Sequence, residues 1–349
     1  MLVTGHSGFK GAWLWQWLAA LGADLSGISL FPEQRPNLFE AAHLGGLRGS
    51  CLADVRDAAR TRRMMAELAP EIVFHLAAQA LVRRSYVQPI YTFETNVLGT
   101  ANVLEAILST PSVRAAVIVT SDKCYRPNPA VDAYREDDEL GGADPYSASK
   151  ACAEIVAESW RRSFFSTMEP LRGVATARGG NVIGGGDWAE DRLVPDCIRA
   201  FETGRPIEIR NPASRRPWQF VLDALNGYLA LAERLFADPG GFSQAWNFGP
   251  DHEQSVPVSG VVERLAKFWK RSDPWTEPAA GASLHEQERL VIDSTKARNR
   301  LDWRPLLDLD GAIEWTAEWR IRFWRGEDAA RLCTEQIERF ESQMRGTEI

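Results

Sequence analysis

Short apolar runs alternate with helical patterns through the first half of this chain. The runs that predict strands are 2–4, 24–30, 71–77, 115–120 and 173–177, and the patterns that predict helices between them are 12–21, 58–68, 90–108 and 146–164. Strand–helix–strand alternation at this spacing requires parallel strands with right-handed crossovers, so helices cover both faces of the sheet. The sequence therefore predicts an α/β fold with a doubly wound parallel sheet.

The pattern changes after the glycines at 184–186. Arginine, proline and tryptophan become frequent in 205–220, and helices are predicted at 221–236 and, at the end of the chain, 329–344. We expect a smaller, mainly helical C-terminal lobe that closes over the carboxyl edge of the sheet. The predicted units are 1–180 and 181–349, with some segments interleaved.

Composition excludes several classes of function. The net charge of −7 argues against a nucleic-acid surface, because phosphate binding needs a basic footprint. Five scattered cysteines without a CxxC or Cys/His pattern predict reduced thiols in a cytoplasmic protein and no metal site. No run approaches the roughly 18 apolar residues of a membrane span. The signal-peptide-like segment 10–23 is interrupted by Gln16 and followed at once by a strand pattern.

A glycine-rich turn, 4-TGHSGFKG-11, joins the first strand to the first helix. Gly5, Gly8 and Gly11 have the spacing that permits a tight turn, close approach of the backbone to a pyrophosphate, and close helix–strand packing. The N–H groups at the start of the following helix would face the phosphates. This context predicts a Rossmann-like dinucleotide site. The first strand is short, which a start site upstream of Met1 would explain.

Two further stretches support a dinucleotide site. Asp54 follows an apolar position and suits the adenine amino group as a hydrogen-bond acceptor, while the small Ala77 and Ala78 allow a backbone loop to lie against the cofactor. Helix capping by Asp54 and core packing of the alanines are the alternatives. The candidate cofactor residues are Gly5, Gly8, Phe9, Lys10, Gly11, Asp54, Val55, Ala77, Ala78, Gln79, Asn96, Tyr146 and Lys150. Glu33 and Arg35 after the second strand leave NAD or NADP open, because an acid favours NAD and an arginine a 2′-phosphate.

The segment 144-DPYSASKACAE-154 places a phenol and an ammonium on one face of a helix. Pro145 suits the first helical turn, and Tyr146 and Lys150 are four residues apart. A nearby positive charge favours the phenolate, which predicts a tyrosine base that acts near neutral pH. The strand at 115–120 ends in 119-VTSDKCY-125, where Ser121, Asp122 and Lys123 supply a hydroxyl, a carboxylate and an ammonium.

The chain resembles the extended short-chain dehydrogenases/reductases and, more narrowly, their CDP-glucose 4,6-dehydratase family, over nearly its whole length. The residues that carry this resemblance are 3-VTGHSGFKGAWL-14, 71-EIVFHLAAQALVRRSY-86, 119-VTSDKCY-125, 141-GGADPYSASKACAE-154, 181-NVIGGGDWAEDRLVPD-196 and 210-RNPASRRPWQ-219. The resemblance implies an NAD-dependent enzyme of deoxysugar and O-antigen synthesis. It also implies a homodimer packed through helices 90–108 and 146–164.

The resemblance also implies roles for the catalytic residues. Tyr146 would act as base while C4 of the hexose is oxidised and hydride passes to the nicotinamide, with Ser121 bonded to the C4 oxygen. Lys150 would hold the nicotinamide ribose. Asp122 would protonate the C6 hydroxyl as it leaves, and hydride would return to C6. Lys123 would be the C5 base or would stabilise the enolate, a choice that residue types leave open because a lysine is normally cationic.

The resemblance further implies substrate-binding residues and shows four departures. Asn181, Arg192, Arg216, Asn247 and His285 are expected near the nucleotide sugar, since arginine suits a diphosphate. A surface ion pair for Arg192 and a turn cap for Asn247 are the alternatives. The four departures from the family pattern are Ala130, Asp132, Ala143 and Phe220.

Three functions fit the sequence. The first is dehydration of CDP-glucose to CDP-4-keto-6-deoxyglucose. The second is another nucleotide-sugar 4,6-dehydratase, acting on dTDP- or GDP-sugars, or a nucleotide-sugar 4-epimerase, although an epimerase does not need Asp122. The third is a dinucleotide-binding protein without catalytic activity, against which the joint presence of Ser121, Tyr146 and Lys150 argues.

Overall fold

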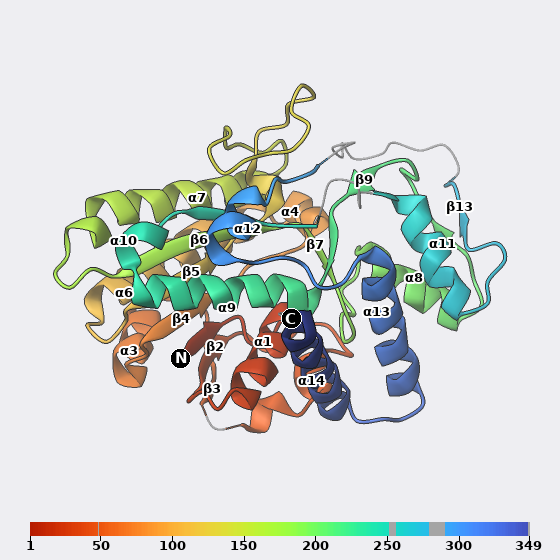
Figure 1. The fold of residues 1–349 in the computed structure, drawn as a ribbon, viewed down its shortest axis with the longest axis horizontal. Helices are drawn as coiled ribbons and strands as arrows, with labels where there is room; N and C mark the ends of the chain where they lie inside the picture. Colours follow the sequence, from red (N-terminus) through yellow and green to blue (C-terminus); the bar gives the residue numbers. More distant parts are fainter. Residues whose placement is uncertain (48, 251–255, 279–289, 348–349) are drawn as a thin grey trace.

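The computed structural model describes residues 1–47, 49–250, 256–278 and 290–347. Its centre is a seven-stranded parallel sheet with the strand order β11-β6-β5-β4-β1-β2-β3 (Figure 1). The strands are β1 (Leu2–Thr4), β2 (Ser26–Ser29), β3 (Ser50–Leu52), β4 (Ile72–His75), β5 (Ala115–Val119), β6 (Gly173–Gly179) and β11 (Ala245–Phe248). The predicted doubly wound α/β fold is therefore confirmed.

Helices cover both faces of this sheet, which explains why its central strands carry unbroken apolar runs. One face packs against α1 (Phe9–Ala20) and α9 (Val221–Ala237). The other packs against α3 (Ala58–Leu68), α6 (Gly99–Ser109) and α7 (Pro145–Ser163). All five residues of β5 are buried. Polar side chains on β5 can therefore appear only where the strand ends.

The smaller lobe lies to the right of the sheet in Figure 1 and is built mainly from helices. Its helices are α8 (Leu193–Glu202), α11 (Val258–Phe268) and α13 (Leu309–Trp324). This part of the chain also forms three short strand pairs: β7 (Asn181–Ile183) with β10 (Trp218–Phe220), β8 (Ile207–Glu208) with β13 (Trp275–Thr276), and β9 (Arg215–Arg216) with β12 (Val256–Pro257). The remaining short elements are α2 (Leu38–Ala41), η1 (Leu44–Gly46), α4 (Val82–Val87), α5 (Pro89–Phe93), η3 (Asp122–Cys124), η4 (Phe165–Thr167), α10 (Pro239–Phe242) and α12 (Thr295–Leu301).

The chain returns to the sheet after residue 180. β11 pairs with β6 in register from Ala245 opposite Thr176 to Phe248 opposite Gly179, and α12 packs on β11 and α9. Residues after 180 therefore contribute to the central sheet as well as to the smaller lobe. The sequence prediction missed β3 and β11, the strands at the two edges of the sheet.

The prediction of one continuous helix over 90–108 is wrong, because a π turn interrupts it. The segment forms α5, then a π-helical turn, η2 (Glu94–Leu98), and then α6. Within the π turn, Asn96 faces the loop after β4: its Oδ1 accepts from the Gln79 amide at 2.8 Å and its Nδ2 donates to the Gln79 carbonyl at 3.0 Å. The π turn thus coincides with a contact to a residue 17 positions away, which a helical pattern does not encode.

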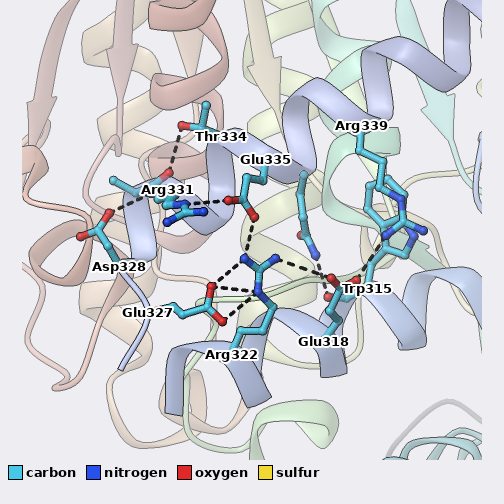
Figure 2. A network of polar contacts seen from close by, with 11 residues as sticks. Trp315, Glu318, Arg322, Glu327, Asp328, Arg331, Thr334, Glu335 and Arg339 are labelled. Atoms are coloured by element: carbon cyan, nitrogen blue, oxygen red, sulfur yellow. Dashed lines mark hydrogen bonds and ion pairs between the residues drawn. The ribbon is translucent and has the colours of Figure 1, made fainter. Parts of the chain in front are cut away.

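The last helix, α14 (Ala329–Thr347), packs against both α1 and α13. Phe340 is fully buried, and its ring lies edge-on to Trp17 of α1 at 5.6 Å. On the outer side, Figure 2 shows Arg322 of α13 between Glu327 and Glu335, with Nη2–carboxylate distances of 2.6 and 2.7 Å. Apolar burial and an ion-pair network thus act on opposite sides of the same helix.

We expect Phe340→Ala to lower the free energy of unfolding by about 3–5 kcal/mol, because it leaves a cavity in the core. Arg322→Met should cost about 1 kcal/mol or less, because its ion pairs are partly exposed to solvent. Denaturant and thermal unfolding of both variants would measure the difference. Equal losses would mean that the ion pairs hold α14 as strongly as the apolar contact does.

Candidate active site

The site begins where β5 leaves the core of the sheet. Ser121 lies two residues beyond the last strand residue, and its Oγ accepts a hydrogen bond from the Lys123 amide at 3.2 Å, which starts the turn η3. Its hydroxyl also donates to Oδ1 of Asp122 at 3.1 Å. The three adjacent polar residues therefore form a tight turn at the carboxyl edge, and Ser121 and Asp122 are both buried.

Helix α7 brings a second group of residues to the same edge. Asp144 caps the helix by accepting from the Ser147 amide at 2.9 Å, and Pro145 occupies the first turn. Tyr146 and Lys150 follow on the buried face of the helix. The Lys150 ammonium donates to the Val119 carbonyl at 3.4 Å, so it contacts the last residue of the strand that carries Ser121.

These residues line one cavity of about 920 Å³ between the sheet and the smaller lobe. The predicted site residues on its wall are Lys10, Ala78, Ser121, Asp122, Lys123, Tyr146, Lys150, Asn181, Arg192 and Arg216. The structure thus joins residues from the whole length of the Rossmann-like unit with residues of the lobe. Predicted His285 lies outside the described residues.

Asn247 is not brought to the cavity. It is fully buried, its Oδ1 accepts from the Tyr125 hydroxyl at 2.7 Å, and its Nδ2 donates to the Tyr134 and Asp293 carbonyls at 2.9 and 3.1 Å. Both amide hydrogens are therefore already used within the protein. The structure places this side chain behind the site, where it holds loops together.

Burial dominates the acid–base behaviour of the catalytic candidates. It raises the pKa of Tyr146 to about 12, although a hydrogen bond with Ser121 acts in the opposite direction. In the ligand-free chain, removing the phenolate from water therefore costs more than its polar neighbours return, and the role of Tyr146 as base stays a prediction. Burial also lowers the pKa of Lys150 to about 8, against the attraction of Glu154.

Burial also shifts the pKa values of Asp122 and Lys10, in each case toward the neutral form. Burial raises the pKa of the Asp122 carboxyl, while Lys123, Ser121 and Arg216 partly oppose the change. Its Oδ2 atom has no hydrogen-bond partner within the described residues. Burial lowers the pKa of Lys10 to about 7, with Lys150 and Arg192 adding to the effect. A carboxyl whose pKa is raised by burial thus lines the same cavity as the tyrosine.

The glycine turn fits a dinucleotide diphosphate. Gly5 has a φ of +75°, and a Cβ there would lie 2.6 Å from the Ala77 nitrogen. A Cβ on Gly11 would lie 2.1 Å from the Gly5 oxygen, whereas one on the exposed Gly8 would meet only that oxygen, at 3.4 Å. Helix α1 also begins without a side-chain cap. Its N-terminus is therefore left open to an anion.

The other cofactor candidates are held by internal contacts. Asp54 accepts from Arg56, with Nε and Nη2 at 2.9 and 2.6 Å from Oδ2. Val55 is buried below Gly99. Gln79 and Asn96 are buried and bonded to each other, and Asn96 also donates to Ser149 at 2.9 Å. Through Asn96 of η2, these contacts link the loop after β4 to the helix that carries Tyr146 and Lys150.

The four departures from the family pattern have different positions. Ala143 lines the cavity. Phe220 is buried in the core, with its ring 5.5 Å from that of Trp315. Ala130 and Asp132 are exposed on the loop after η3. Of these four, Ala143 is the one placed to change the shape of the site.

Sequence reasoning missed two groups at or below the site. Arg83 and Asp191 line the cavity and pair across it, with Nη1 and Oδ1 2.5 Å apart. Glu154 lies one helical turn beyond Lys150, fully enclosed beneath the cavity. The continued spacing Tyr146, Lys150, Glu154 was the available signal for the second group, because residues four apart share a helix face.

The fold and the glycine turn define a dinucleotide-binding enzyme of the Rossmann type. Residues 1–249 match the model of the NAD dependent epimerase/dehydratase family, and the chain belongs to this family. NAD is accordingly its cofactor.

Two curated relatives and one solved structure are similar to this chain. It is 44% identical to the CDP-glucose 4,6-dehydratase of Salmonella typhimurium over 96% of this chain and 94% of that protein. It is 29% identical to the UDP-glucose 4-epimerase of Mycolicibacterium smegmatis over 91% and 97% of the two chains. The fold matches the Thermus thermophilus UDP-glucose 4-epimerase in complex with NAD, with a TM-score of 0.76, 24% identity and coverage of 91% and 97%.

Two kinds of feature are absent from the described ranges. No helix there is long and apolar enough to cross a membrane. No group of three or more histidine, cysteine or acidic side chains in the same ranges is arranged to hold a metal ion.

We expect Gly8→Ala to weaken cofactor binding and Gly11→Ala to lower the stability of the fold. Gly8→Ala should weaken NAD binding about tenfold or more without changing the melting temperature, because its Cβ would occupy only the open side of the turn. Gly11→Ala should destabilise the fold by about 1–3 kcal/mol or more, because its Cβ has no room. Titration calorimetry and thermal unfolding would test this. A loss of stability in Gly8→Ala would contradict the assignment of an open cradle.

Proposed function

We propose that the chain is a CDP-glucose 4,6-dehydratase, which converts CDP-glucose to CDP-4-keto-6-deoxyglucose and water. The observation that carries this proposal is the buried Asp122 carboxyl beside Ser121 and Tyr146 on the wall of one cavity. An epimerase does not need this carboxyl, but an elimination needs an acid at the leaving group. The 44% identity to a CDP-glucose 4,6-dehydratase over 96% of the chain supports the same reaction.

The first step is the oxidation of C4. NAD, when bound, supplies the hydride acceptor and later the donor. Ser121 donates a hydrogen bond to the C4 oxygen, and Tyr146 takes the C4 hydroxyl proton as general base. Because burial raises the pKa of Tyr146 to about 12 in the ligand-free chain, the positive charge of Lys150 is needed close by to stabilise the phenolate.

The second step is the loss of water across C5 and C6. The C4 ketone makes the C5 proton acidic, and Asp122 protonates the C6 hydroxyl as it leaves. A carboxyl must be protonated to act as this acid, and burial of Asp122 raises its pKa in that direction. Lys123 lines the same cavity: as a neutral amine it would take the C5 proton, and as an ammonium it would stabilise the enolate while another group takes that proton. Hydride then returns to C6 and a proton returns to C5, which gives the 4-keto-6-deoxy sugar.

The nucleotide is held by the lobe side of the cavity. Asn181, Arg192 and Arg216 line this wall, and guanidinium groups bind diphosphates through paired donors. Arg192 lies 3.1 Å from Asp187 through Nη1 and Oδ2, so this arginine is orientated before substrate arrives.

The second candidate is a nucleotide-sugar 4-epimerase or a 4,6-dehydratase that acts on dTDP- or GDP-sugars. The 29% identity to a UDP-glucose 4-epimerase favours the former, and Ala143 at the cavity wall favours a changed sugar-nucleotide preference. A non-catalytic dinucleotide-binding protein would not need the arrangement of Ser121, Asp122 and Tyr146.

The deciding experiment is incubation of the purified protein with NAD and, separately, with CDP-, dTDP-, UDP- and GDP-hexoses, followed by mass spectrometry. Loss of one water from CDP-glucose supports the proposal. Water loss from a different nucleotide sugar assigns a sister dehydratase. Conversion of UDP-glucose without a mass change, detected as galactose after hydrolysis, assigns an epimerase, and no conversion at all assigns a binding protein.

We expect Asp122→Asn to slow dehydration by about 100-fold or more, because the amide cannot donate the proton that the leaving hydroxyl requires. Oxidation of C4 should continue, so NADH absorbance should accumulate during a single turnover. Asp137→Asn, on an exposed position of the following loop, is the matched control and should behave as wild type. Loss of the NADH signal together with dehydration would show that Asp122 acts before elimination.

We also propose a cytoplasmic homodimer of deoxysugar and O-antigen synthesis. Its interface would lie on α4, α5, η2 and α7, where Val87, Ile90, Leu98 and Ile155 are 82%, 69%, 58% and 56% exposed. Large apolar side chains gathered on neighbouring helices favour association. Five free cysteines are typical of a reducing compartment.

We expect the double variant Leu98→Glu/Ile155→Glu to be monomeric, because it places four buried charges in a two-fold interface. Size-exclusion chromatography with light scattering would measure the mass. Trp324→Glu, which removes a side chain 69% exposed at the end of α13, is the control and should leave the mass unchanged. A dimer that survives the double variant would place the interface elsewhere.

A further inference from the structure

Glu154 is a buried carboxylate for which the proposed reaction gives no role. It lies one helical turn beyond Lys150 and two beyond Tyr146, so the three side chains share one face of α7. The side chain is 1% exposed. Removing a carboxylate from water is costly, and such a group is stable only if it has partners.

Three donors satisfy this carboxylate. The Thr120 hydroxyl donates to Oε1, and the Thr176 hydroxyl and Nη2 of Arg178 donate to Oε2 at 2.7 and 2.8 Å. Thr120 is the residue directly before Ser121, and Thr176 and Arg178 belong to β6. One side chain therefore links the helix of Tyr146 to the end of the strand that carries Ser121 and to the next strand.

Arg178 extends the link to the loop beyond the site. Its Nη1 donates to the Tyr125 hydroxyl at 2.8 Å and to the Glu136 carbonyl at 2.9 Å. Tyr125 follows η3 directly. The segment 120–125, which contains Ser121, Asp122 and Lys123, is therefore held at both ends by the Glu154–Arg178 ion pair.

Lys150 lies among both positively and negatively charged groups. The titratable or charged groups that interact with Lys150 or Glu154 come from several elements: Lys10 of α1, His75 of β4, Cys124 of η3 and Arg178 of β6. Asp122 of η3 and Tyr146 of α7 line the same cavity as Lys150. Among the groups that favour the charged form of Lys150, Glu154 has the largest effect and the Cys124 thiol the next largest. Burial acts against that form.

We propose that Glu154 is a positioning residue of this enzyme: its carboxylate fixes Ser121 relative to Tyr146 and keeps Lys150 charged. This inference rests on the proposed function for its catalytic consequence, but its electrostatic part concerns the cofactor site alone. The protonated form of Lys150 exists below its pKa, so activity that needs the ammonium is lost as pH rises through that value. Removing the charge of Glu154 moves this loss to lower pH.

Glu154→Gln is the primary test, because the amide is close in shape to the carboxylate but carries no charge. We expect the alkaline limb of the kcat profile to move about one pH unit or more toward acid, the range expected for a close charge partner. The pH at which NAD binding weakens, measured by calorimetry without any sugar, should move in parallel. A fall in kcat with both limbs unmoved would overturn the proposal and leave only a structural role.

Two further variants complete the design. Glu158→Gln is the matched control, since Glu158 lies one turn further on α7 and pairs with Arg161 and Arg162; it should leave both profiles unchanged. Glu154→Asp keeps the charge but shortens the side chain, so the limb should stay in place while kcat falls several-fold. If Glu154→Gln does not fold, an unchanged kcat in Glu154→Asp would overturn the proposal. NAD binding without sugar separates this outcome from failure of the CDP-glucose assignment.

Discussion

Burial of a parallel sheet on both faces is the constraint on which the rest of this structure depends. Because α1 and α9 cover one face and α3, α6 and α7 the other, β5 has no room for polar side chains until it ends. Its hydroxyl, carboxylate and ammonium therefore appear together at the carboxyl edge, where the smaller lobe closes one cavity over them. The place of the chemistry follows from how the sheet is packed.

The same burial sets the charge states in the site. It raises the pKa of Tyr146 and Asp122 and lowers that of Lys150 and Lys10, so each group is shifted toward its neutral form before any ligand is present. An acid for the leaving group benefits from this shift, whereas a tyrosine base is opposed by it. The buried Glu154 carboxylate, which is paired with Arg178, acts against the neutralisation of Lys150.

Much of this organisation could be predicted from the sequence, and its failures have physical causes. Helix 58–68 was placed to the residue, because a capping aspartate precedes it and its apolar spacing is regular. The π turn at Glu94–Leu98 was missed because Asn96 contacts Gln79, a residue 17 positions away. Asn247 was assigned to the cavity by resemblance, but the loops around it use its amide.

By itself, the sequence determined the alternation of strands and helices, the glycine turn and the residue types at the ends of β5 and α7, because each is encoded in a short segment with its own periodicity or spacing. Only the tertiary structure decided which side chains share the cavity and how far burial shifts their pKa. It alone also placed Glu154 between Thr120, Thr176 and Arg178. Contacts between distant segments and the loss of water around them exist only once the chain is packed.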